Sequence, residues 1–173
     1  METKVLVAYA STNGSTQEIA EAIAGTLREN GLSVDLQPMR KVQSLQEYRA
    51  VVLGAPLYMF HWHKDVLKFL PKHRDALVEL PVAIFASGPS FTGDEKECQE
   101  VHRQIHKELA KFPWLTPLAV EIMGGKFDPA KLRFPLNLLP ALKNLPASDL
   151  RDWTAIRAWA SGLAVKFQPA VSA

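Results

Sequence analysis

The sequence lacks several features that would identify a class of protein at once. Its only cysteine among 173 residues is Cys98, which excludes an internal disulfide framework and fits a reducing cytosol. It has no apolar run of about 18 residues, the length that crosses a bilayer, and no signal peptide at its start. Neither charge sign dominates, since 20 Lys and Arg face 18 Asp and Glu, which argues against nucleic-acid binding. These absences predict a soluble, cytoplasmic protein.

What the sequence does contain is the composition of an ordinary globular chain. Hydrophobic residues make up 47% and charged residues 22% of the total. A chain of this length buries a substantial core without disulfides or metal ions. We therefore expect residues 1–173 to form a single domain.

Short apolar runs alternate with helical patterns along that domain. The run Lys4–Ala10 predicts a buried strand, and apolar residues at helical spacing then lead to Gly31, a helix terminator. Further strands are expected at 33–36 on an edge and, buried, at 50–54, 81–85 and 118–122; further helices are expected at 64–70, at 94–111 and from a cap at Ser148 to about 166. The alternation predicts an α/β fold, a doubly wound five-stranded parallel sheet of order 2-1-3-4-5 with helices on both faces. Its ligand crevice would lie at the carboxyl ends of the strands.

One connection interrupts this alternation. Residues 125–147 contain four prolines and eight large apolar side chains between the last strand and the last helix. A connection of this length is uncommon in a compact domain unless it is functional or disordered, and its apolar content argues against disorder. We expect an apolar, proline-rich insertion that acts as a lid or a membrane-surface anchor, with a plug over the sheet edge or a dimer contact as the alternative.

The turn after the first strand carries the clearest chemical signal. It reads Ser11-Thr12-Asn13-Gly14-Ser15-Thr16 and stands immediately before a helix. Free amides and the helix dipole favour an anion there, and the hydroxyls suit a single phosphate. The loop lacks the lysine of a Walker A loop and the spacing of a dinucleotide motif. The structural alternative is a helix N-cap formed by Ser15 or Thr16.

This loop resembles the FMN phosphate loop of flavodoxins. Gly54-Ala55, the sequence His61-Trp62-His63 and a final helix beginning at Asp152-Trp153 narrow the resemblance to the bacterial menaquinone-dependent protoporphyrinogen dehydrogenase branch, although Phe60 stands where that branch has a glycine. The resemblance implies a flavodoxin-like fold that binds FMN. It also implies that the loops 55–63 and 87–94 enclose the isoalloxazine ring.

The cofactor-binding residues are therefore expected in three loops. Aromatic stacking on the ring is expected from Tyr58, Phe60 or Trp62, unless these residues simply pack under the following helix. His61 and His63 form no complete metal site, and their expected role is a hydrogen bond at the flavin edge or to the substrate. No residue is expected to be a covalent catalyst. The expected binding residues are Ser11, Thr12, Asn13, Gly14, Ser15, Thr16, Pro56, Leu57, Tyr58, Met59, Phe60, His61, Trp62, Ser87, Gly88 and Pro89.

The function that follows is an FMN-dependent oxidoreductase, a protoporphyrinogen- or quinone-linked dehydrogenase. Its expected partners are a quinone or another apolar small molecule, with peripheral contact to the inner face of the membrane through residues 125–147. The alternative is a flavodoxin-type electron-transfer protein that docks on redox partner proteins. The mildly basic net charge of +2 and the apolar insertion favour the enzyme.

Overall fold

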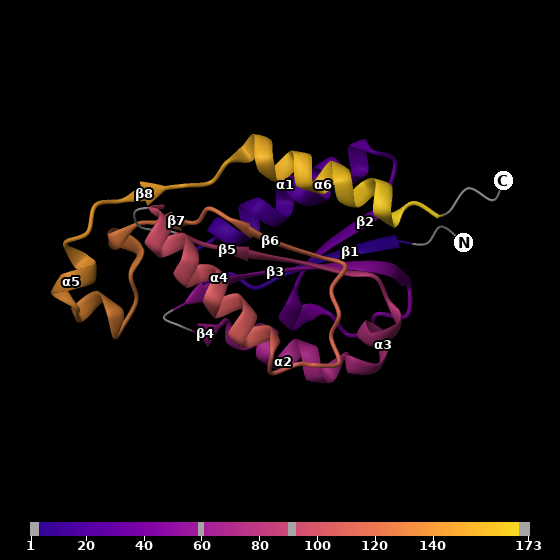
Figure 1. Cartoon of the computed structure of the whole chain (residues 1–173), viewed down its shortest axis with the longest axis horizontal. Coiled ribbons are helices and arrows are strands. Elements are labelled where there is room, and N and C mark those ends of the chain that lie inside the picture. The colour runs from indigo at the N-terminus through magenta and orange to yellow at the C-terminus, as the bar shows by residue number, and fades with distance from the viewer. Residues whose placement is uncertain (1–3, 59–60, 90–92, 170–173) are drawn as a thin grey trace.

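Five parallel strands form the centre of the computed structural model, which describes residues 4–58, 61–89 and 93–169 (Figure 1). The strands are β1 (Lys4–Tyr9), β2 (Val34–Pro38), β3 (Tyr48–Tyr58), β5 (Val82–Ser87) and β6 (Ala119–Met123). Their spatial order is β2-β1-β3-β5-β6, so the predicted doubly wound order is confirmed. The order reverses between β1 and β3, and ligands of such sheets bind at the carboxyl ends of the strands beside that reversal.

Helices cover both faces of the sheet (Figure 1). One face carries α1 (Ser15–Glu29) and α6 (Trp153–Phe167), whose apolar residues form one core cluster with the sheet. The other carries α2 (Lys64–Lys72), α3 (Arg74–Glu79) and α4 (Glu95–Leu109), which bury a second cluster. Because both faces are covered, the central strands are continuously apolar, and polar groups collect at the strand ends.

Several smaller elements lie beyond the carboxyl ends of the strands. The short strand β4 (His61–Trp62) pairs antiparallel with the end of β3. The strands β7 (Lys126–Phe127) and β8 (Ser148–Asp149) form a separate antiparallel pair, and between them lies α5 (Pro140–Lys143) with two single-turn helices at Pro129–Lys131 and Leu136–Leu138.

Three details differ from the sequence-based expectations. The strand predicted at 118–122 is not buried, because β6 lies at the edge of the sheet and leaves Val120 38% exposed. The last helix begins after Asp152, whose carboxylate accepts a hydrogen bond from the Ala155 amide, whereas Ser148 lies in β8. Helix α2 continues through Pro71 to Lys72.

A close side-chain contact joins β3 and β5. Gly54 and Phe85 are register partners on these strands, and both are buried. The Phe85 ring occupies the space where a β-carbon on residue 54 would lie, so only glycine fits there. The same ring meets Trp159 of α6 edge-on, with ring centroids 6.3 Å apart. Phe85 therefore fixes α6 against the strands that end at the crevice.

Replacing Gly54 with alanine is expected to lower the free energy of unfolding by about 1–3 kcal/mol, because the new methyl group and the Phe85 ring need the same space. Urea unfolding of the apoprotein, followed by circular dichroism, measures this change. The matched control is Gly25→Ala in α1, where a β-carbon meets no atom within 4 Å. That control is expected to gain about 0.5–1 kcal/mol from helix propensity. Equal losses in the two variants would contradict the packing argument.

Candidate functional site

The turn between β1 and α1 is built to present backbone amides. Gly14 is the N-cap residue of α1 and has a left-handed backbone with φ of 88°, which glycine adopts without strain. Its N–H donates to Ser11 Oγ over 2.9 Å. The first helical bond runs from the Glu18 amide to the Gly14 carbonyl, so the preceding amides of the first turn point forward without helical partners. The structural alternative, in which Ser15 or Thr16 caps this helix, is wrong, because the N-cap residue is Gly14 and no side chain makes a cap hydrogen bond there.

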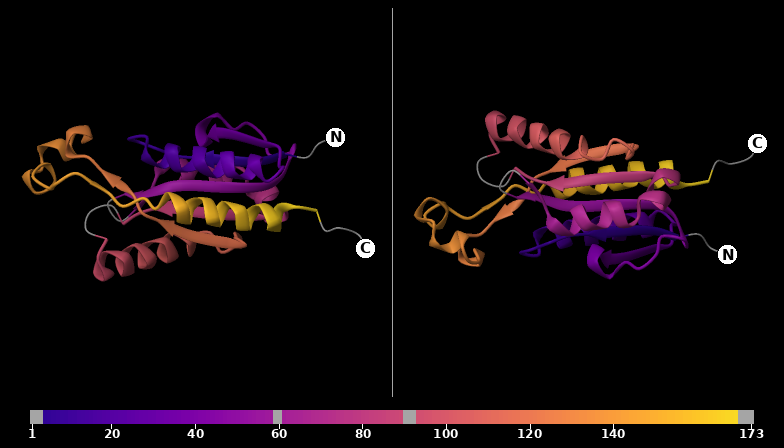
Figure 2. Two further views of the ribbon diagram at one scale, coloured as in Figure 1. Left: turned by 90° about the horizontal axis from the view of Figure 1, so that it is seen from above. Right: turned by 90° about the horizontal axis from the view of Figure 1, so that it is seen from below.

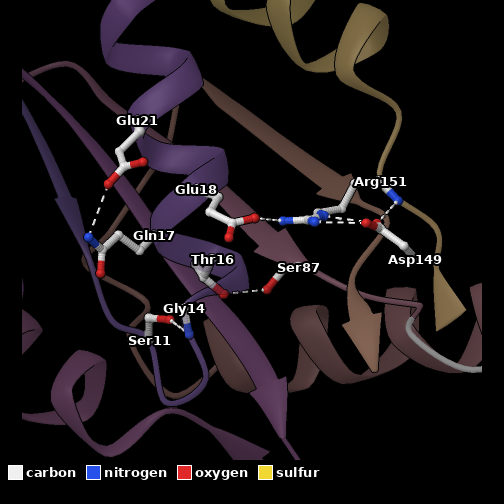
Figure 3. A network of polar contacts seen from close by, with 9 residues as sticks. All are labelled: Ser11, Gly14, Thr16, Gln17, Glu18, Glu21, Ser87, Asp149 and Arg151. Carbon is white, nitrogen blue, oxygen red and sulfur yellow. Dashed lines mark hydrogen bonds and ion pairs between the residues drawn. The ribbon is translucent and has the colours of Figure 1, made fainter. Parts of the chain in front are cut away.

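Two hydroxyls of this turn are held by the other loops of the crevice. Thr12 Oγ1 lies 3.1 Å from His63 Nε2, at the junction of β4 and α2. Thr16 Oγ1 lies 2.8 Å from Ser87 Oγ at the end of β5, and this pair is buried (Figure 3). The three loops that the sequence analysis selected therefore meet at one place.

The loop after β3 divides into a part that faces the crevice and a part that faces the core. Pro56 and Leu57 line the crevice and are partly exposed. Trp62 is 3% exposed and packs in the core cluster under α2. For this residue, packing under the following helix is therefore the correct alternative to stacking on the flavin ring. His61 is exposed, with its Nδ1 4.0 Å from the buried carboxylate of Glu108. Tyr58 ends β3, while Met59 and Phe60 lie outside the described residues.

The loop after β5 contributes Ser87, Gly88 and Pro89 to the crevice. Ser87 and Gly88 are buried and Pro89 is partly exposed. A β-carbon on Gly88 would meet Val101 of α4 at 3.5 Å, an ordinary contact, so protein packing alone does not require glycine here. Gly88 and Pro89 line the larger cavity.

Two cavities adjoin each other among these loops. The smaller cavity has a volume of about 50 Å³. It is lined by all of the turn 11–16 except Gly14, together with Pro56, Leu57, Ser87, Gly125 and Lys126. The larger, of about 300 Å³, shares Asn13, Ser15, Leu57 and Lys126 with the first. It extends between α4 and the insertion, and its wall is mostly apolar. The site therefore consists of a small polar pocket that opens into a larger apolar one.

The insertion forms an arm, which we define as residues 126–149. It projects past the carboxyl ends of the strands, away from the rest of the sheet (Figure 2). Leu132, Leu136 and Leu142 line the larger cavity from the arm side. On its outer side, Phe134 is 79% and Leu138 is 66% exposed. The arm therefore has an inner apolar face over the cavity and an outer apolar face in solvent.

Arg151 fastens the base of the arm to α1. Its side chain is only 4% exposed and donates two hydrogen bonds to the carboxylate of Asp149, at 2.9 and 2.7 Å. It also pairs with Glu18 in the first turn of α1 (Figure 3), and its guanidinium lies 4.8 Å from the Trp153 ring. The pairing also balances the Glu18 charge, which would otherwise stand beside an anion bound at the same helix end.

The contact between Arg151 and Asp149 weakens only in strong acid. The hydrogen bonds from Arg151 hold the pKa of Asp149 below its usual range. Because the folded-state pKa is then lower than the unfolded value of about 3.9, the contribution to stability is complete above that value. It is lost only as the pH falls through the lower, folded-state pKa. The arm base therefore stays fastened at neutral pH.

Residues from outside the three loops complete the site. Lys126 borders both cavities, and Lys131 with Glu97 and Glu100 of α4 borders the larger one. The basic residues of the insertion were visible in the sequence, but their place over the crevice depends on the pairing of β7 with β8. The carboxylates of α4 gave no signal, because they have the spacing of an ordinary solvent-facing helix surface.

Two absences bear on the chemistry of this site. Within residues 4–58, 61–89 and 93–169, no group of three His, Cys, Asp or Glu side chains is placed to hold a metal ion. In the same part of the chain, no helix combines the length and the apolar character needed to pass through a membrane.

Comparisons with known proteins agree with this geometry. A family model described as a flavodoxin domain matches residues 6–135. The curated protoporphyrinogen IX dehydrogenase (quinone) of Escherichia coli K12 is 27% identical over 134 residues, which cover 76% of this chain and 71% of that protein. A protein of the same name from Leishmania major is 24% identical over 172 residues, covering 93% and 74%.

Solved structures show the same fold. Oxidised flavodoxin 1 from Bacillus cereus superposes with a TM-score of 0.58 at 19% identity, covering 98% of this chain and 99% of that one. The flavodoxin of the pneumococcal strain TIGR4 superposes with a TM-score of 0.57 at 18% identity, covering 94% and 98%.

Replacing Arg151 with methionine, which keeps the length but removes the donors, is expected to loosen the arm. Hydrogen bonds to charged groups are worth about 1.5–3 kcal/mol each, so amides of β7 and β8 should exchange with solvent at least about tenfold faster. Hydrogen–deuterium exchange read by mass spectrometry measures this. Arg103→Met is the control, because Arg103 is 72% exposed and pairs with Glu100 on its own helix. Unchanged exchange in the Arg151 variant would show that other contacts hold the arm.

Proposed function

Since the chain belongs to the flavodoxin domain family, as an FMN-binding oxidoreductase of that fold, we propose that it oxidises a bulky apolar donor of the porphyrinogen class and reduces a quinone. When bound, FMN supplies the redox chemistry, taking up two electrons and giving them back. The observation that carries the proposal is the apolar cavity of about 300 Å³ that opens from the phosphate loop and lies under the arm.

The residues of the crevice fit FMN by their chemistry. The small polar pocket offers the first-turn amides of α1 and the hydroxyls of Thr12 and Ser15 to a phosphate. Lys126 adds a positive charge at the border of both cavities. Leu57 on one side and Gly88 with Pro89 on the other provide apolar walls for a flat ring. Tyr58 and His61 remain candidates for contact with the edge of the flavin ring, whereas Trp62 is buried in the core.

The larger cavity fits a donor with an apolar body and charged edges. Its leucines, Leu132, Leu136 and Leu142, suit the body of a tetrapyrrole. Lys126 and Lys131 on the arm suit its propionates, and Glu97 and Glu100 on α4 suit its pyrrole N–H groups, because carboxylates accept such hydrogen bonds. The relatives from E. coli and L. major are named for protoporphyrinogen IX and for quinone, which supports the same pair of substrates here.

The outer face of the arm is the proposed contact with a membrane surface. Phe134, Leu138 and Leu139 are exposed on it. Arg133 and Lys143 are also exposed in this segment, and such a basic fringe attracts anionic lipid by about 1 kcal/mol per charge. A quinone dissolved in the bilayer would then reach the crevice from the arm side. In this proposal the chain is one flavodoxin-like domain and the arm is its insertion.

The alternative is an electron-transfer protein that docks on other proteins. The exposed apolar side chains of the arm also suit a protein partner, and this is the observation in its favour. The two functions differ in what the purified chain does alone. The proposed enzyme reduces a water-soluble quinone analogue with an apolar donor and no added protein, whereas a shuttle requires its redox partners.

Combining Thr12→Val with Ser15→Ala is expected to weaken FMN binding at least tenfold, because each lost hydrogen bond to the charged phosphate costs about 1.5–3 kcal/mol. Riboflavin, which lacks the phosphate, should bind as before. Fluorescence titration of the apoprotein measures both affinities. Thr154→Val on the exposed face of α6 serves as the control. Unchanged FMN affinity would place the phosphate elsewhere.

Replacing residues 128–147 with Asn-Gly is expected to leave FMN binding intact and to reduce quinone reduction about tenfold or more. A two-residue turn joins the paired strands β7 and β8 directly, while the lid over the apolar cavity is lost. Steady-state kinetics and flavin titration measure the two effects. An unfolded or aggregated product would instead favour a structural plug, and full activity would contradict the proposed role of the arm.

Vesicle cosedimentation tests the membrane contact with the fold intact. Arg133→Gln with Lys143→Gln is expected to release the protein from vesicles containing anionic lipid, because two charges beside the apolar tip are removed. Arg157→Gln with Lys166→Gln makes the same charge change on α6 and should retain binding. If both pairs bind anionic vesicles equally, the basic fringe of the arm has no role in attachment.

A further inference from the structure

His63, which is not part of the phosphate loop, contacts one of the hydroxyls of that loop. Its Nε2 lies 3.1 Å from Thr12 Oγ1, although 51 residues separate the two in sequence. The histidine side chain is only 11% exposed. It is also the N-cap residue of α2, because its Nδ1 accepts a hydrogen bond from the Asp65 amide over 3.1 Å. Both ring nitrogens therefore have a partner.

These two contacts decide where the ring proton is. The Asp65 backbone N–H is always a donor, so Nδ1 must present its lone pair. In the neutral ring the proton is then on Nε2, which donates to Thr12. The Asp65 carboxylate lies 3.9 Å from Nδ1, beyond hydrogen-bonding distance, and does not compete with the amide.

The surroundings of the ring favour the neutral form. Burial lowers the pKa of His63, and Lys64 and Arg40 lower it further, although the Asp65 carboxylate acts in the opposite direction. The N-terminus of α2 also disfavours a positive charge on its capping residue. The ring thus keeps its lone pair toward α2 and its proton toward Thr12.

The orientation of the Thr12 hydroxyl follows from this. An oxygen that accepts from His63 still carries its own hydrogen, which needs another acceptor. Thr12 is exposed and lines the small polar cavity with Ser15 and Thr16. Thr16, by contrast, already pairs with Ser87. Thr12 is therefore a hydroxyl of the loop whose hydrogen is available to an anion in that cavity.

We infer that His63 is a positioning residue for the cofactor phosphate: it holds Thr12 as a hydrogen-bond donor and so makes the site selective for a phosphorylated flavin. This inference rests on the proposed phosphate site in residues 11–16. It assigns a role to the loop after β3 that differs from enclosing the flavin ring. The imidazole ring of His63 thereby joins the N-terminus of α2 to the loop that precedes α1.

Two substitutions separate the two contacts of the ring. His63→Asn keeps an acceptor where Nδ1 lies, and asparagine is a good N-cap, but its side chain is too short to reach Thr12. His63→Gln keeps a donor near the position of Nε2. Circular dichroism and thermal unfolding of each apoprotein establish that the fold is retained before flavin is added.

The measurement is the affinity of each apoprotein for FMN and for riboflavin, titrated by flavin fluorescence. We expect His63→Asn to weaken FMN binding about tenfold and to leave riboflavin binding within about twofold. The reason is that the variant loses only the contact that orients the Thr12 hydroxyl toward the phosphate. His63→Gln should recover most of the FMN affinity. In a Thr12→Val background, His63→Asn should have no further effect, because the hydroxyl it orients is absent.

Other outcomes would overturn the inference. Equal weakening of FMN and riboflavin by His63→Asn would show that the histidine merely supports the loop. No change in either affinity would show that the contact with Thr12 is not used. If the wild-type protein itself bound riboflavin as tightly as FMN, the phosphate site would be wrong as well. The proposed reaction with donor and quinone is tested separately by turnover, so its failure would leave these affinities unaffected.

Discussion

The contact between Phe85 and Gly54 determines much of this structure. Because Gly54 has no side chain, the Phe85 ring extends over the neighbouring strand and contacts Trp159. That packing fixes α6 against the sheet, and α6 begins just after Arg151, which fastens the arm to α1. The position of the arm over the crevice thus depends on a contact in the core, through a helix and a buried arginine.

The fold was largely predictable because its signals are local and repeated. The apolar run Lys4–Ala10 indicates a strand, and Gly31 indicates where the following helix ends. The alternation of strands and helices then indicates the parallel sheet. The error at β6 has a physical origin: its apolar residues resemble those of a buried strand, and only its place at the sheet edge exposes them. The start of the last helix was misplaced for a similar reason. Ser148 and Asp152 are equally good N-cap residues by type, and only the pairing of β8 excludes Ser148.

The site was predictable only where one segment carries the whole signal. The turn from Ser11 to Thr16 has its hydroxyls, glycine and helix start in six consecutive residues. The aromatic loop was ambiguous, because the sequence does not show which side of the chain faces the core, and Trp62 faces it. The contact of His63 with Thr12 and the pairing of Arg151 with Glu18 join residues far apart in the chain. Such contacts have no periodicity, so no local pattern indicates them.

The arm is joined to the domain by the antiparallel strands β7 and β8, which form only two residue pairs, Lys126 with Asp149 and Phe127 with Ser148. At its base the backbone of Gly124 lies so close to the Leu150 carbonyl that a β-carbon would not fit. A segment closed so tightly is modular: doubling its length adds only about 0.6 kcal/mol of closure entropy. Evolution can therefore lengthen, shorten or exchange the twenty residues between β7 and β8 without disturbing the sheet. In the proposed enzyme, changes in this segment would alter which molecules enter the crevice and would leave the sheet unchanged.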